Sequence, residues 1–180
     1  MTHFVVQKRP HASIGAVVAL TALLASAAAF GQSGPFDSLA GSWAGGGQIS
    51  FADGHTERVR CRSDSKVGEA GNAIEQSLRC ASDSYNFTLH SAAQARGGQI
   101  SGTWSEETRN VSGNLSGRVE GNRIAVRAVA GNFTVALTLT TTGNSQAVTI
   151  QPQGETQITG AAVKLTRRGA NAMATPGDLR

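Results

Sequence analysis

Cysteine, histidine and aromatic residues are scarce in this 180-residue chain. After residue 31, no stretch keeps a helical hydrophobic period over about ten residues, which argues against a helical domain. Two histidines lie beyond residue 31, and neither His55 nor His90 has a cluster of Cys, Asp or further His around it. Because zinc needs roughly three or four ligands, we expect no metal site, and nothing in the sequence calls for a cofactor.

Recognisable catalytic motifs are also missing. Ser116 lies in residues 113–117 (GNLSG), which is not the Gly-x-Ser-x-Gly motif of serine hydrolases. Glu106 and Glu107 are adjacent, so in a strand they would point to opposite faces, and we place them at a solvated hairpin end. No glycine-rich loop leads into a helix that could cradle a phosphate. The sequence therefore predicts a protein that is not an enzyme.

The first 31 residues predict export. Lys8 and Arg9 precede an apolar, alanine-rich stretch over residues 14–30, and small residues follow, which is the order of a secretory signal peptide. A membrane anchor is the rival interpretation, because the stretch approaches the length that spans a bilayer. The small residues at its end favour cleavage. We thus expect a periplasmic or secreted bacterial protein with no transmembrane segment once residues 1–31 are removed.

Charge excludes one class of partner. The formal net charge is +4, and removing Lys8 and Arg9 leaves about +2, too little for a nucleic-acid-binding footprint. What remains has the length of a single domain. We expect a linker over residues 32–37, one domain over residues 38–167 and a disordered tail over residues 168–180.

The chain is rich in short runs that alternate polar and apolar residues, broken by Gly, Asn or Asp at intervals of about 10–12 residues. Residues 109–120 alternate most regularly. Such runs predict an all-β antiparallel meander of about eight to ten strands. Closure into a small up-and-down barrel removes exposed edges and is the favoured fold, with a β-sandwich as the alternative. In the last strand, about residues 155–166, the apolar phase shifts after Ile158, which predicts a β-bulge near Gly160.

The two cysteines, Cys61 and Cys80, each lie in an alternating run, and residues 63–72 between them have the composition of a turn or loop. In an exported chain they predict one disulfide, with two free buried thiols as the alternative. The bridge would join strand 56–62 to the strand that ends near Cys80, with Arg62 opposite Arg79 and Lys66 opposite Glu75.

Three runs carry a resemblance to a known family: residues 35–43 (PFDSLAGSW), 79–85 (RCASDSY) and 97–104 (GGQISGTW). Together they resemble a family of small exported proteins from rhizobia and related alphaproteobacteria. The resemblance implies a periplasmic or secreted address and supplies no functional residues. The start Gly41-Ser42-Trp43 also resembles the Gly-x-Trp start of calycin barrels (lipocalins and avidins), in which the Trp plugs one end. An ordinary core Trp is the other interpretation.

Two functional hypotheses follow. A barrel of about eight strands can enclose one small ligand, and the small inward residues Gly102, Gly113, Gly117 and Ala128 would leave room for it. We therefore predict that the barrel binds a small apolar or amphipathic ligand. The aromatic residues expected to line such a cavity, which would otherwise be plain core, are Trp43, Tyr85, Phe87 and Trp104.

The alternative is a filled-core interaction or structural protein, for example an inhibitor-like module, that acts through its loops or through one basic strand face. The outward-facing arginines of that face are Arg58, Arg60, Arg62 and Arg79. An acidic partner would bind there. The competing interpretation is a solvated face, whose charges keep the sheet from pairing edge to edge.

Overall fold

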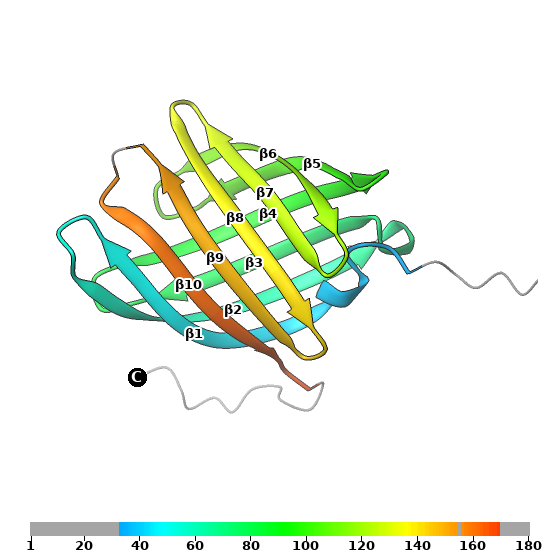
Figure 1. Cartoon of the computed structure of the whole chain (residues 1–180), viewed down its shortest axis with the longest axis horizontal. Coiled ribbons are helices and arrows are strands. Elements are labelled where there is room, and N and C mark those ends of the chain that lie inside the picture. The colour runs from blue at the N-terminus through cyan, green and yellow to red at the C-terminus, as the bar shows by residue number, and fades with distance from the viewer. Residues whose placement is uncertain (1–32, 155, 170–180) are drawn as a thin grey trace, which may run out of the picture. The chain divides into compact units, whose positions relative to one another are not determined.

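The computed structural model of the chain describes residues 33–154 and 156–169. They form a closed barrel of ten antiparallel strands, in which each strand pairs with its neighbours in sequence and β1 pairs with β10 (Figure 1). The predicted barrel is thus confirmed over the sandwich. The strands are β1 (Gly41–Phe51), β2 (Thr56–Gly68), β3 (Ala73–Ala81), β4 (Asn86–Arg96), β5 (Gln99–Glu106), β6 (Val111–Glu120), β7 (Arg123–Ala130), β8 (Phe133–Thr142), β9 (Ser145–Gln153) and β10 (Ile158–Arg167).

Glycine-asparagine turns connect the strands from β6 to β9. The hairpins β6–β7, β7–β8 and β8–β9 each have a two-residue loop, because Glu120 pairs with Arg123, Ala130 with Phe133 and Thr142 with Ser145. The first loop residue is a glycine with positive φ in each case, for example 61° at Gly121. That conformation suits the right-handed twist of the flanking strands and costs glycine little.

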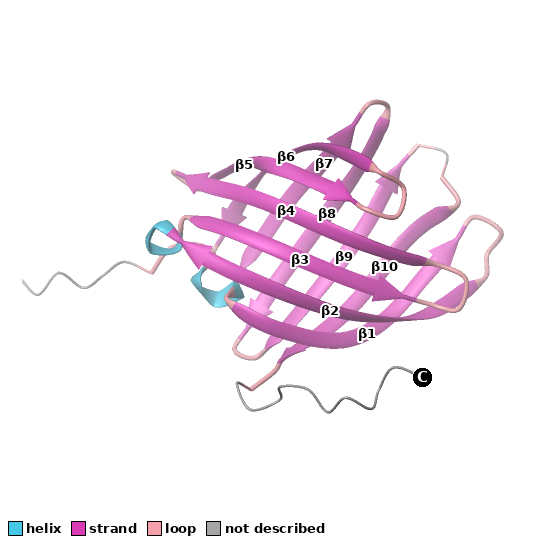
Figure 2. Cartoon of the chain, turned by 180° about the vertical axis from the view of Figure 1, so that it is seen from behind, coloured by secondary structure: helices cyan, strands magenta, loops and turns pink. Residues whose placement is uncertain are grey.

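The two ends of the barrel differ. Two short 3-10 turns, η1 (Asp37–Leu39) and η2 (Glu69–Gly71), lie at one end, hereafter the closed end (Figure 2). Phe36 and Leu39 are 2% and 4% exposed there, and the Phe36 N–H donates to the carbonyl oxygen of Gly71 (3.0 Å). The prediction that residues 32–37 are a plain linker is therefore wrong at Phe36, which packs into the core. The opposite end, hereafter the open end, holds the turns from β1 to β2 and from β3 to β4.

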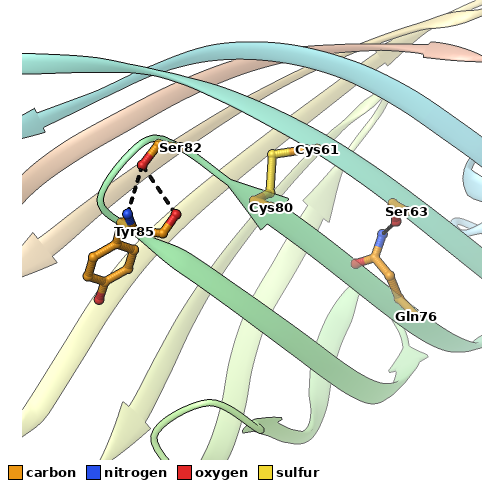
Figure 3. The surroundings of a disulfide bond; sticks show 6 residues. All are labelled: Cys61, Ser63, Gln76, Cys80, Ser82 and Tyr85. Carbon is orange, nitrogen blue, oxygen red and sulfur yellow. Dashed lines mark hydrogen bonds between the residues drawn. A yellow bond between two sulfur atoms is a disulfide. The ribbon is translucent and has the colours of Figure 1, made fainter. Parts of the chain in front are cut away.

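The disulfide between Cys61 and Cys80 is confirmed, and it joins directly opposed residues of β2 and β3 (Figure 3). Arg62 lies opposite Arg79 and Lys66 opposite Glu75, as expected. The loop predicted over residues 63–72 is wrong, because β2 continues to Gly68 and only η2 turns the chain. Ser63 and Ser65 face inward there and accept hydrogen bonds from the Gln76 amide, so hydroxyls replace the expected apolar side chains.

Glycines on the inner face of β1, β5 and β6 mark places where neighbouring strands come very close. A Cβ on Gly113 would lie 1.9 Å from the carbonyl oxygen of Val129, and one on Gly102 2.1 Å from that of Ala92. The adjacent backbone already occupies the space of the missing side chain. The prediction that Gly102, Gly113 and Gly117 leave room for a ligand is therefore wrong, whereas glycine is required at these sharp bends.

The bulge predicted near Gly160 is confirmed. Ser50 pairs with Gly160 and Phe51 with Ile158, so Thr159 has no opposite residue in β1, and its hydroxyl donates to the Ser50 carbonyl oxygen. The last strand begins at Ile158, later than expected, and after it the Arg168 N–H donates to the Ser42 carbonyl oxygen (2.8 Å). The predicted signal peptide and residues 170–180 of the predicted tail lie outside the described residues. Within residues 33–154 and 156–169, no helix has the length and apolar character to cross a bilayer.

Candidate ligand-binding site

On β8, inward-facing side chains become less buried from the closed end of the barrel to the open end. Leu139 near η1 is 8% exposed, Leu137 is only half-buried, and Phe133 at the open end of the strand is 36% exposed. On the opposite wall the inward residues stay buried up to the open end, with Val59 of β2 2% exposed. Since apolar residues in the middle of a filled core are normally buried, the interior is accessible from the open end on the β8 side.

Between these two regions lies an internal cavity of about 60 Å³. Most of its wall is apolar, and three polar side chains, Ser63, Gln76 and Gln146, also line it. No ionisable side chain is among the described residues of this wall. The apolar residues of its wall include Leu78, Phe87, Leu137, Val148, Ile150 and Val163. The space is well below the roughly 150 Å³ that accommodates benzene, so only a slender group fits without movement of the walls.

Gln146 is the unusual member of this wall. It lies on the inward phase of β9, where Val148 and Ile150 occupy the following inward positions, and it is 0% exposed. Neither its amide nitrogen nor its amide oxygen has a hydrogen-bond partner among the described residues, and the same holds for the Thr141 hydroxyl opposite it in β8. A buried polar group without a partner costs about 1–3 kcal/mol, so this amide is suited to a partner inside the cavity.

The other two polar side chains of the wall are bonded to each other. The Gln76 Nε2 donates to the Ser63 hydroxyl (3.1 Å, Figure 3) and to the Ser65 hydroxyl (3.2 Å). These bonds fix Gln76 across β2 and β3, next to the disulfide. The unsatisfied hydrogen-bonding capacity of the wall is therefore concentrated on Gln146.

Charged groups gather at the rim of the open end instead. Hydrogen bonds from the hydroxyls of Ser82 and Ser84 hold the pKa of Glu57 at about 2, far below its usual value. The Ser84 backbone N–H also donates to Glu57 (3.2 Å), which ties the β1–β2 hairpin to the β3–β4 turn. His55 stacks on Phe51, with 4.2 Å between ring centroids, and its hydrogen bond to Asp53 raises the pKa of the imidazole.

Glu106 differs from its predicted place at a solvated hairpin end. It faces inward near the open end and is 8% exposed. Its carboxylate accepts hydrogen bonds from the backbone N–H groups of Thr88 (3.2 Å), Thr108 (2.9 Å) and Arg109 (2.8 Å). Burial alone would raise the pKa of Glu106, but the hydrogen bonds outweigh it and lower the pKa overall. Glu106 thus fixes the β5–β6 turn and remains negatively charged.

Most of the four aromatic residues expected to line a cavity lie away from its wall. Of these, only Phe87 is among the described residues of the cavity wall. Trp43 is 0% exposed, its indole N–H donates to the Leu39 carbonyl oxygen (2.9 Å), and the Arg167 guanidinium lies 4.2 Å above its ring. The ring centroids of Trp104 and Phe133 lie 6.4 Å apart. Tyr85 packs edge to face against Phe87, also with 6.4 Å between ring centroids.

Gln146 was missed by the sequence analysis although a signal for it exists. In the run 145–153, Gln146 falls on the same phase as Val148 and Ile150. A polar residue at an apolar position of a predicted strand faces the core, where it needs a hydrogen-bond partner. That conflict between residue type and phase is the feature that could have identified it.

The four arginines of the predicted basic strand face lie on the neighbouring strands β2 and β3. Arg58, Arg60 and Arg62 are exposed on β2, and Arg79 is exposed opposite Arg62 on β3. Lys164 of β10 extends the row, because Gly46 of β1 pairs with both Arg60 and Lys164. Within the described part of the chain, none of these five cations forms an ion pair.

A larger hollow lies elsewhere, on the outer face of β2 to β6, with a volume of about 720 Å³. Short side chains such as Ser77, Ala92 and Thr103 line it, and Ala92 and Thr103 are exposed. It is a shallow depression of a curved sheet and does not enclose a ligand. We therefore place the candidate site inside the barrel, although the internal cavity is smaller.

Comparison with known proteins identifies only the fold. No family model matches the sequence. No curated protein is significantly similar to it. Among solved structures, the chain is similar to Rv2717c from M. tuberculosis, with a TM-score of 0.56, 13% identity and coverage of 74% of this chain and 94% of that one. It is also similar to the S-type phycobiliprotein lyase from Guillardia theta, with a TM-score of 0.50, 12% identity and coverage of 75% and 91%.

Proposed function

We propose that this chain is an exported binding protein whose barrel takes up a small apolar or amphipathic ligand through the open end. The observation that carries the proposal is the buried Gln146 amide, which has no partner among the described residues and lines a mostly apolar cavity. An amphipathic ligand would cover the accessible walls with its apolar part and satisfy this amide with its polar part.

The dimensions of the site limit the ligand to a slender shape. A cavity of about 60 Å³ leads toward half-buried apolar walls at the open end, so a linear alkyl chain fits better than a ring system. Each methylene that moves from water onto apolar walls contributes about 0.8 kcal/mol. A short alkyl chain on the ligand can thus supply the binding free energy without a large preformed pocket.

The proposal of export rests on the disulfide and on the predicted signal peptide. Disulfides such as that between Cys61 and Cys80 persist in oxidising compartments and are rare in the cytosol. We therefore propose the periplasm or the extracellular space as the site of action.

A matched pair of variants tests the proposal. Ala161 lines the cavity and Ala162, the next residue of β10, is exposed on the outer face. Native mass spectrometry of protein purified from its own periplasm, and titration with a fluorescent alkyl probe, should show binding in the wild type and in Ala162→Phe. Ala161→Phe should lose it, and Ala161→Leu is the substitute if the phenylalanine variant does not fold. Equal binding by folded Ala161 and Ala162 variants would place the ligand elsewhere.

A second candidate function follows from the basic strand face. Five exposed cations without an ion pair among the described residues lie on the outer face of β10, β2 and β3, with Gly46 of β1 between Lys164 and Arg60. We propose that these cations bind an acidic protein partner, because complementary charge steers and orients such encounters. Pull-down with Arg60, Arg62 and Arg79 replaced by Ser tests it, and an unchanged set of partners would reject it.

A further inference from the structure

The chemistry of the cavity wall defines the kind of polar group that a ligand can carry. The Gln146 amide needs an acceptor for its nitrogen and a donor for its oxygen, because neither atom has a partner among the described residues. Gln146 lines the cavity, so a ligand group that both donates and accepts hydrogen bonds would satisfy both of its polar atoms.

The wall offers no counter-ion. None of its described side chains is ionisable, and burying an unpaired ion costs far more than burying a neutral polar group. Arg167, the cation on the inner phase at the closed end, is engaged with the carbonyl oxygens of Ala40 and Ser38 and with the ring of Trp43. A carboxylate head group would therefore be buried without a positive partner.

Charges at the open end do not supply a free counter-ion either. Glu57 and Glu106 lie near this end and are ionised, and the cationic Arg109 there lies 3.4 Å from the Glu106 carboxylate. An ammonium head would also be buried without a counter-ion, and it has no acceptor to offer the Gln146 nitrogen.

We infer that the ligand carries an uncharged head group that both donates and accepts hydrogen bonds, such as an alcohol or a primary amide, on a slender alkyl chain. The inference rests on the proposed ligand binding and goes beyond it, because it excludes fatty acid anions, the ordinary probes for an apolar barrel. The alkyl chain lies against Leu78, Phe87, Leu137 and Ile150, and the head group lies at Gln146.

Three probes of equal chain length test this inference on the full exported protein: 1-octanol, octanamide and sodium octanoate at pH 8. Titrations are followed in a proton–nitrogen correlation spectrum, in which the side-chain amide of Gln146 has its own pair of signals. We expect octanol and octanamide to shift this pair and to bind at least about tenfold more tightly than octanoate, since one lost hydrogen bond is worth roughly this factor.

Gln146→Leu should weaken the binding of octanol and octanamide about tenfold, because their head group loses its hydrogen-bond partner, while octanoate remains the weakest of the three probes. Gln146→Met serves if the leucine variant does not fold. Gln151→Leu, on the exposed face of the same strand, is the matched control and should keep the wild-type affinities. Equal binding of octanoate in the wild type, or unchanged octanol and octanamide affinities in Gln146→Leu, overturns the neutral head group at Gln146 and leaves ligand binding intact. If none of the probes binds the wild type, the proposed function itself fails.

Discussion

Gln146 is a polar side chain at an apolar position, and its burial is costly in the absence of a ligand. The amide occupies the inward phase of β9 with both of its polar atoms unpartnered among the described residues. Such a residue lowers stability while it serves binding, a relation that is common at functional sites. The same side chain thus connects the sequence pattern, the packing of the barrel and the proposed specificity.

Gln146→Leu should therefore stabilise the ligand-free protein, by about 1–2 kcal/mol, because the folded state no longer buries an unpaired amide. Urea unfolding of protein stripped of ligand, followed by circular dichroism, measures the change. Gln151→Leu should remain within about 0.5 kcal/mol of the wild type, as expected for an exposed position. A lower stability of Gln146→Leu would mean that the amide is satisfied in the folded protein.

At the scale of the strand, the inner positions of β1, β5 and β6 require glycine because the backbone of the neighbouring strand lies very close. Gly113 has the Val129 carbonyl oxygen where a Cβ would be placed, whereas Gly68, at the end of β2, has no atom within 4 Å of that position. Gly113→Ala should therefore destabilise the barrel by about 1–3 kcal/mol, since strand β6 or β7 must shift. Gly68→Ala is the control and should change little, because its φ of −132° is open to any residue. Equal effects of both variants in urea unfolding would contradict this account.

The rim of the open end gives stability a dependence on pH. The folded-state pKa of Glu57 is about 2, below its ordinary value of 4.5, so its contribution to stability is present above pH 4.5 and is lost as the pH falls toward 2. Glu57→Gln should remove this part of the acid dependence, measured as the melting temperature between pH 6 and pH 2.5. Glu75→Gln, an exposed glutamate of β3, should keep it. An acid profile of Glu57→Gln identical to that of the wild type would reject the role of the Ser84 hydrogen bonds.

At the scale of the molecule, alternation and turn residues were enough to predict the closed barrel, the disulfide and the register of β2 against β3. They failed where side chains departed from the apolar pattern. Ser63 and Ser65 face the interior and are hydrogen-bonded by the Gln76 amide. Because these inward residues are polar, the second half of β2 has the composition of a loop and was not predicted as a strand. Phe36 was assigned to a linker because its burial depends on strands distant in sequence, and the cavity depends on how the whole barrel packs.

The disulfide is the covalent link of this otherwise locally connected barrel. It closes a loop with a sequence separation of 19 between β2 and β3, whose register also positions Ser63 and Gln76 beside the cavity. Loss of such a bridge relaxes a constraint on the unfolded chain and costs about 3 kcal/mol. The double variant Cys61→Ala, Cys80→Ala should lose this much free energy of unfolding in urea. It should still bind 1-octanol when folded, because the strand pairing and the Gln76 bonds to Ser63 and Ser65 remain. A double variant that folds with wild-type stability would show that the bridge adds nothing to the barrel, and one that folds but no longer binds would show that the bridge itself shapes the cavity.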